Sequence, residues 1–113
     1  MDGLAAYQDL EDVQAELFAE VGKMEQAGVQ LARNEAEYRK ELAKEMLRRR
    51  ADGMAVSMLS DVCRGDARIA GLKLQRDCSD AIYSASKERI NVLKLRLRIL
   101  QAQMKREWSD IPR

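Results

Sequence analysis

Carboxylates and two thiols are among the side chains of this sequence that could take part in chemistry. Histidine is absent from the 113 residues, which removes the commonest general base and the commonest ligand of transition metals. A Ser-His-Asp or Cys-His nucleophile and a di-iron site of the Glu-x-x-His type therefore cannot be built. The sequence also contains no P-loop and no glycine-rich dinucleotide turn.

Carboxylates alone could hold Mg²⁺ or carry out glycosidase chemistry, and Glu41 and Glu45 form a candidate pair, four residues apart. Nearly every acid, however, lies in a helical pattern beside a basic residue, which is typical of ion pairs on a helix surface. We therefore expect that the protein is not an enzyme and that it uses no cofactor and no metal ion.

The two cysteines and the apolar runs bear on the cellular compartment. Cys63 and Cys78 form no Cys-x-x-Cys pair, and we expect reduced, buried thiols, with a disulfide as the alternative. The apolar runs are far shorter than the roughly 20 residues of a membrane span, and the N-terminus does not resemble a secretion signal. These features predict a cytoplasmic protein that makes no contact with a membrane.

The elements that must position these side chains are helices. Charged residues make up 35% of the chain and aromatic residues only 4%, and Pro112 is the single proline, a composition that favours long helices. A first helix is predicted at about residues 8–51, ending before Gly53. Its apolar residues recur three and four apart, with Glu35 at one position of the stripe: Leu10, Val13, Leu17, Val21, Met24, Gly28, Leu31, Tyr38, Leu42 and Met46.

A connector at residues 52–65 is predicted to contain a short helix capped by Ser57. Gly65 and Asp66 then provide a helix stop and a new N-cap, so a second long helix is expected at about residues 66–108. Its stripe alternates steps of three and four, as a coiled-coil seam does: Ile69, Leu72, Arg76, Ser79, Tyr83, Ser86, Ile90, Leu93, Leu97, Leu100 and Met104.

The fold class is therefore all-α: residues 1–113 form a single helical domain in which two long helices make an antiparallel coiled-coil hairpin. The charge distribution supports this orientation, because residues 1–20 are acidic and residues 87–106 are basic. In this register Leu17 should lie near Leu100. Trp108 should close the end of the hairpin against Tyr7 and Leu10, with an anchor for a partner as the alternative.

The second helix carries more apolar residues than one partner helix can cover. Seven of them flank the seam: Leu74, Cys78, Ile82, Ala85, Val92, Leu95 and Ile99. Either the connector folds over this face or the hairpin forms a homodimer as a four-helix bundle. We favour the homodimer because the connector is short.

Basic residues are the candidates for binding a partner. Five lie near the connector: Arg48, Arg49, Arg50, Arg64 and Arg68. Lys94 and Arg98 lie in the basic segment of the second helix. The alternatives are charge that complements the helix dipole at Arg48–Arg50 and charge that is paired within the hairpin at residues 87–106. Met54, Met58 and Leu59 could offer an apolar surface to a partner or cover the end of the seam.

The second helix also contains a pattern that is shared with other sequences. From Tyr83 it reads Tyr83-x-Ala85-x-x-Glu88-x-Ile90-Asn91-x-x-Lys94, followed by Arg98, Leu100, Gln103 and Arg106-Glu107-Trp108, with Arg64-Gly65-Asp66 near its start. It resembles the C-terminal helix of small coiled-coil proteins encoded by phages and prophages, which have no assigned activity. The resemblance implies a bacterial host cytoplasm and a phage accessory protein that binds a host protein or a protein–nucleic-acid complex, inhibitors of host defence such as anti-CRISPR proteins included.

Together these patterns predict a non-catalytic helical interaction protein, dimeric, that docks a charged surface on a protein partner. The alternative is an accessory protein of phage replication or recombination that binds nucleic acid directly. Such binding must weaken steeply with salt.

Overall fold

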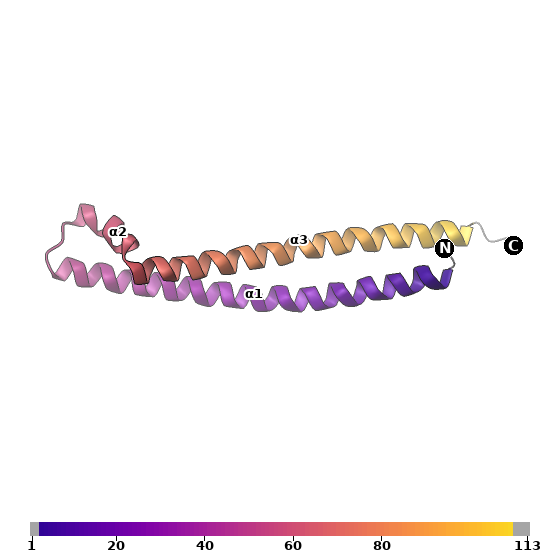
Figure 1. Ribbon diagram of the computed structural model, residues 1–113, viewed down its shortest axis with the longest axis horizontal. Helices are drawn as coiled ribbons and strands as arrows, with labels where there is room; N and C mark the ends of the chain where they lie inside the picture. Colours follow the sequence, from indigo (N-terminus) through magenta and orange to yellow (C-terminus); the bar gives the residue numbers. More distant parts are fainter. Residues whose placement is uncertain (1–2, 110–113) are drawn as a thin grey trace. The chain divides into compact units, whose positions relative to one another are not determined.

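The computed structural model describes residues 3–109, which form three helices (Figure 1). Helix α1 spans Gly3–Ala51, α2 spans Val56–Gly65 and α3 spans Ala67–Ser109. No strand occurs within the described range, so the all-α prediction is confirmed. The first helix begins at Gly3 rather than near residue 8, because Ala6 belongs to its inner face and is completely buried.

The end of α1 is where the sequence predicted it. Gly53 has a φ of 97°, a left-handed conformation that glycine adopts without steric cost. The amide of Gly53 donates to the carbonyl of Arg50 and that of Met54 to Arg49, both at 3.1 Å. These bonds satisfy carbonyls that the last helical turn would otherwise leave unpaired.

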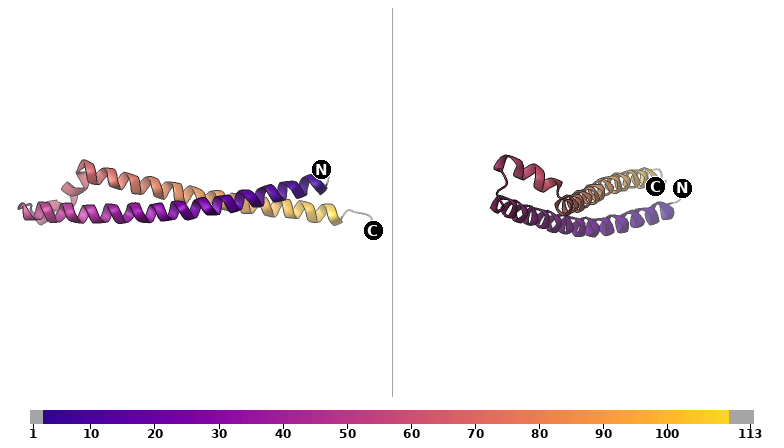
Figure 2. Two further views of the ribbon diagram at one scale, coloured as in Figure 1. Left: turned by 90° about the horizontal axis from the view of Figure 1, so that it is seen from below. Right: turned by 60° about the vertical axis from the view of Figure 1, so that its left-hand side comes forward.

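The two ends of α2 have different capping residues. Ala55 occupies the N-cap position without a side-chain hydrogen bond, so the predicted cap at Ser57 is wrong: the extended backbone of Ala55 starts the helix before Ser57. Asp66 does cap α3, because its Oδ1 accepts hydrogen bonds from the amides of Arg68 and Ile69 at 3.0 and 3.3 Å. Figure 2 shows the sharp bend between α2 and α3 at this point.

The described residues group into two compact units. Residues 3–25 of α1 and 84–109 of α3 form the first unit. The second unit contains residues 26–83 and therefore includes α2. The single domain predicted for residues 1–113 stays a prediction.

In the first unit, the acidic start of α1 lies beside the basic end of α3, as predicted. Arg96 Nη1 is 3.7 Å from Glu16 Oε2, and Arg89 Nη1 is 3.3 Å from Glu20 Oε1. Leu17 therefore lies between the levels of Arg89 and Arg96, and the predicted proximity to Leu100 is wrong. The predicted register placed residue 51, at the end of the first helix, directly opposite residue 66, at the start of the second. Asp2 of the acidic segment lies outside the described residues.

In the second unit, α2 covers part of the long helices with Leu59 and Cys63, both buried. Arg68 of the first turn of α3 bonds to Glu41 at 2.8 Å, ten residues before the end of α1. The last turns of α1 therefore extend past the start of α3, which is why residues 51 and 66 are not level.

All residues of the two predicted stripes are buried or half-buried, so the predicted inner faces are confirmed. Two other residues are not where we predicted them. Cys78 is exposed, because it lies on the face of α3 that turns away from α1. Trp108 is 72% exposed and does not close the helix pair, since α1 offers no residue that covers it in the described range.

Candidate functional site

The structure brings predicted partner-binding arginines to one end of the second unit. Arg48, Arg49 and Arg50 occupy the last turn of α1 and Arg64 the last turn of α2. Arg68 lies in the first turn of α3. Arg48, Arg49 and Arg68 all approach the same carboxylate, that of Glu45.

Glu45 is only 5% exposed and lies among these guanidinium groups. Arg49 Nε donates to Glu45 Oε1 at 2.7 Å, Arg48 binds both carboxylate oxygens, and Arg68 Nη2 is 3.9 Å from Oε2. A carboxylate out of water requires such charge-assisted hydrogen bonds. Three of the predicted partner-binding arginines therefore have a structural role, which the sequence did not reveal.

Hydrogen bonds from Arg48, which has the larger effect, and from Arg49 lower the pKa of Glu45 from the ordinary 4.5 to about 2. Between these values the unfolded chain binds more protons than the folded one, so the stability that the carboxylate contributes is lost as pH falls through this range. We expect wild type to melt several degrees above Glu45→Gln at pH 7, and this difference to shrink from pH 4.5 to pH 2. Thermal melts followed by circular dichroism measure it.

Glu37→Gln is the matched control, because Glu37 is exposed and, within residues 3–109, forms an ion pair only with Lys40. We expect it to melt close to wild type at every pH. A gap between wild type and Glu45→Gln that stays constant down to pH 2 would contradict the role of the Glu45 carboxylate.

The other two arginines of this end are more accessible. Arg50 is exposed and donates to the carbonyl of Met54 at 2.9 Å, and Arg64 is exposed at the end of α2. Where α1 ends, a hollow of about 530 Å³ is bordered by Arg48, Gly53 and Met58. Met58 is 55% exposed, so Leu59 and Cys63, rather than Met58, cover the inner face.

Lys94 and Arg98 lie on α3 in the first unit, and both are exposed. Their spacing of four residues places them on one side of the helix, and Lys105 continues that side seven residues later. The arginines of this segment that form ion pairs with α1 are Arg89 and Arg96. Within residues 3–109, no carboxylate forms an ion pair with Lys94, Arg98 or Lys105, which we call the basic stripe.

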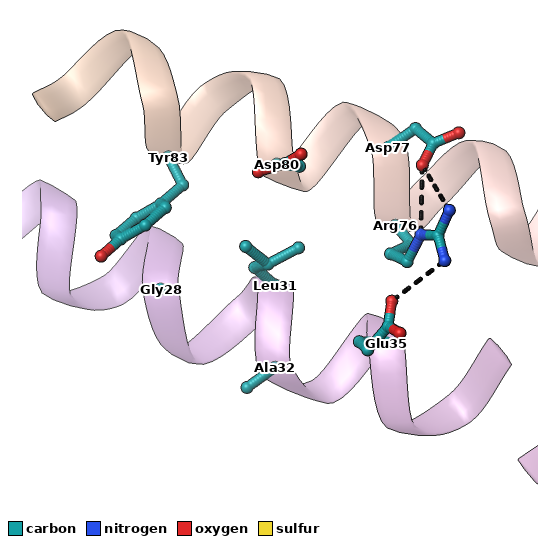
Figure 3. Close-up of a pocket in the computed structure, with 8 residues that line it drawn as sticks. All are labelled: Gly28, Leu31, Ala32, Glu35, Arg76, Asp77, Asp80 and Tyr83. Atoms are coloured by element: carbon teal, nitrogen blue, oxygen red, sulfur yellow. Dashed lines mark hydrogen bonds and ion pairs between the residues drawn. The ribbon is translucent and has the colours of Figure 1, made fainter. Parts of the chain in front are cut away.

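The second unit also has a groove of about 520 Å³ between α1 and α3 (Figure 3). The ring of Tyr83 lies against Gly28, where an added Cβ would come within 3.3 Å of the ring. Arg76 Nη1 is 3.2 Å from Glu35 and its Nη2 is 2.9 Å from Asp77. Hydrogen bonds from Arg39 and from Arg76 lower the pKa of Glu35.

The chemistry of this groove is that of a polar contact between helices. Arg76 also lies over the ring of Tyr38, with Cζ 4.8 Å from the ring centroid, a favourable cation–π geometry. Its guanidinium group therefore has three partners within the unit. We assign Arg76 to the packing of α1 against α3 rather than to a ligand.

The structure also bears on the proposed pair of metal-binding carboxylates. Glu41 accepts a hydrogen bond from Arg68 at 2.8 Å, and Glu45 is bound to Arg48 and Arg49. No group of three or more Cys, Asp and Glu residues in the described part of the chain could hold a metal ion. Nor does any helix there combine the length and hydropathy of a membrane span.

Comparisons with known proteins add no family. No protein-family model, curated protein or solved structure matches the chain.

Proposed function

We propose that this chain is a non-catalytic helical interaction protein whose two long helices form an antiparallel coiled-coil hairpin. Two hairpins associate as a homodimer, and a basic surface of α3 binds an acidic protein partner in the cytoplasm. The order of contacts within each unit supports the hairpin. In the first unit, the later residue of α1, Glu20, pairs with the earlier residue of α3, Arg89, while Glu16 pairs with Arg96.

The basic stripe is the observation that carries the proposed binding. An arginine that is already paired with a carboxylate of its own chain attracts a partner less strongly. Arg48, Arg49 and Arg68 are paired in this way. Lys94, Arg98 and Lys105 lie along one side of α3 over about 17 Å, at 1.5 Å per residue. Such a row matches the spacing of carboxylates on an acidic helix or strand.

The exposed apolar residues of the same unit favour a protein partner. Leu4 and Phe18 of α1 are 78% and 77% exposed, and Trp108 of α3 is 72% exposed. Aromatic and arginine side chains are enriched among the residues that dominate protein–protein binding. The resemblance to phage and prophage proteins would make this partner a host protein, which the phage protein modulates or inhibits.

Reversing the charges of the basic stripe should abolish capture of the partner. We expect Lys94→Glu/Arg98→Glu to lose, by at least about tenfold, a protein that the wild type retains from nuclease-treated bacterial lysate, because like charges across an interface repel. Quantitative mass spectrometry of the retained proteins measures the ratio.

Lys40→Glu/Lys44→Glu is the matched control. It changes the net charge by the same amount, at two exposed lysines that are also four residues apart. We expect this control to retain the partner. Equal retention by all three proteins, or no specific protein with wild type, would contradict the proposed binding.

Direct binding of nucleic acid is the competing function, since lysine and arginine on a long helix can follow phosphates. Light scattering with a short DNA duplex at low and at physiological salt separates the two. Binding that appears at low salt and is lost at higher salt would favour nucleic acid. A homodimer that ignores the duplex would favour a protein partner.

A further inference from the structure

A second row of apolar residues follows the face of α3 that turns away from α1. Val92, Leu95 and Ile99 are 56%, 56% and 50% exposed. Each comes two positions after a residue of the inner seam. Two residues at that spacing point about 200° apart around the helix axis, so this row lies on the side opposite the seam. Ala102 continues the alternation of steps of four and three, and both neighbouring positions of the row are charged: Glu88 before Val92 and Arg106 after Ala102.

We infer that this row is the surface on which a second copy of the chain docks, with the two α3 helices side by side and running in opposite directions. The inference rests on the homodimer proposed above and assigns its interface. The two-fold axis passes level with residue 97, because Glu88 lies nine residues before it and Arg106 nine residues after it.

This register makes the face complementary to itself. Leu95 faces Ile99 of the other copy, and Val92 faces Ala102, so apolar residues meet in the centre. Glu88 faces Arg106 at both ends, and opposite charges at such positions favour one alignment over others. Two copies of the same six residues thus provide both the apolar contact and its ionic ends, as an isologous interface requires.

Neighbouring registers lack this complementarity. A shift of one heptad in one direction sets Glu88 against Ile99, and a shift in the other direction sets Arg106 against Leu95. Either shift would take charges out of water without partners, which is unfavourable. The positions of Glu88 and Arg106 therefore select the alignment centred at residue 97.

The edges of the interface connect it to the proposed partner-binding site. Arg96 and Arg98 flank the centre, and each lies near the same arginine of the other copy. Arg96 is paired with Glu16 of its own chain. The repulsion between exposed like charges is weak. The two Arg98 side chains lie on the same edge of the dimer. Dimerisation thus joins the basic stripes of the two copies into one larger surface for an acidic partner.

Charge reversal at the ends of the row tests the register. We expect Glu88→Arg alone and Arg106→Glu alone each to raise the dissociation constant of the dimer about tenfold or more, because each sets like charges face to face twice. Glu88→Arg/Arg106→Glu should return to within about threefold of wild type, since opposite charges again meet. Sedimentation equilibrium over a concentration series measures these constants, with Glu25→Arg and Lys23→Glu on α1 as controls.

A pair of cysteines tests the same alignment without changing charge. In Val92→Cys/Ala102→Cys with Cys78→Ser, oxidation should give a covalent dimer linked through residues 92 and 102. Within one helix these positions are about 15 Å apart, beyond the reach of a disulfide at about 7 Å. Peptide mapping should find the 92–102 link, and either cysteine alone should give far less dimer.

The outcomes separate this inference from the proposed function on which it rests. A wild-type protein that is monomeric at high concentration would overturn both the homodimer and this interface. A stable dimer that tolerates Glu88→Arg and forms no 92–102 link would overturn the interface and leave the homodimer in place. Failure of the double reversal to restore association, with helix content unchanged, would overturn the register.

Discussion

Replacing Ile69 by alanine should lower the free energy of unfolding by about 2–4 kcal/mol, the usual cost of removing a buried isoleucine side chain and leaving a cavity. Ile69 is completely buried, in the second unit, at the point where α3 begins. Two helices and a short third one bury few large side chains. The loss of one therefore removes a sizeable part of a small total stability.

Urea unfolding followed by circular dichroism measures this change, at a protein concentration held constant for all variants. Ile82→Ala is the control because it removes the same atoms from a side chain that is 61% exposed. We expect the control to change stability by less than about 0.5 kcal/mol. An equal loss from both substitutions would show that Ile69 is not a core residue.

The fold could be predicted from the sequence wherever periodicity and turn chemistry act locally. The inner faces follow from the three-and-four spacing, since an α-helix brings such residues onto one side whatever it packs against. The helix end at Gly53 and the cap at Asp66 follow from backbone preferences of single residues. The start of α1 was missed because the alanine at position 6 contributes little to an apolar pattern.

The polar contacts between helices could not be predicted, because they depend on register. Ser79 and Ser86 were recognised as polar positions of a seam, but not their partners. Asn34 Nδ2 donates to Ser79 Oγ at 2.6 Å, and Ser86 Oγ donates to Glu20 Oε1 at 3.0 Å. Both partners are polar residues of α1 that lie beside its apolar stripe, so the alignment of the two helices identifies them.

The candidate site was predicted only in part for a similar reason. Composition identifies which residues are basic, whereas only contacts show which of them are neutralised. Arg49 and Arg68 are bound to carboxylates that lie 4 and 27 positions away in sequence. The more distant of these bonds is tertiary and leaves no local signal. Lys105 was missed although its seven-residue spacing from Arg98 could have found it.

Replacing the polar pair Glu20 and Ser86 by apolar residues should stabilise the protein. Glu20 is 4% and Ser86 7% exposed, so the carboxylate lies in an apolar seam with one hydroxyl donor and Arg89 nearby. We expect Glu20→Leu/Ser86→Ala to raise the free energy of unfolding by about 1–3 kcal/mol, because well-packed apolar residues often stabilise a protein when they replace a buried charged group and its polar partner. Denaturant unfolding measures the difference.

The single substitution Ser86→Ala should have the opposite sign and lower stability by about 1–2 kcal/mol, because a buried carboxylate loses a donor and gains no apolar contact in return. Glu16→Leu is the control for the double variant, since Glu16 is 57% exposed at its side chain and should change stability little. A double variant that is less stable than wild type would contradict the assignment. If the double variant is more stable, the protein keeps Glu20 and Ser86 at a cost in stability. The benefit is then specificity, because only one alignment of α1 against α3 gives this buried polar pair its hydrogen bond.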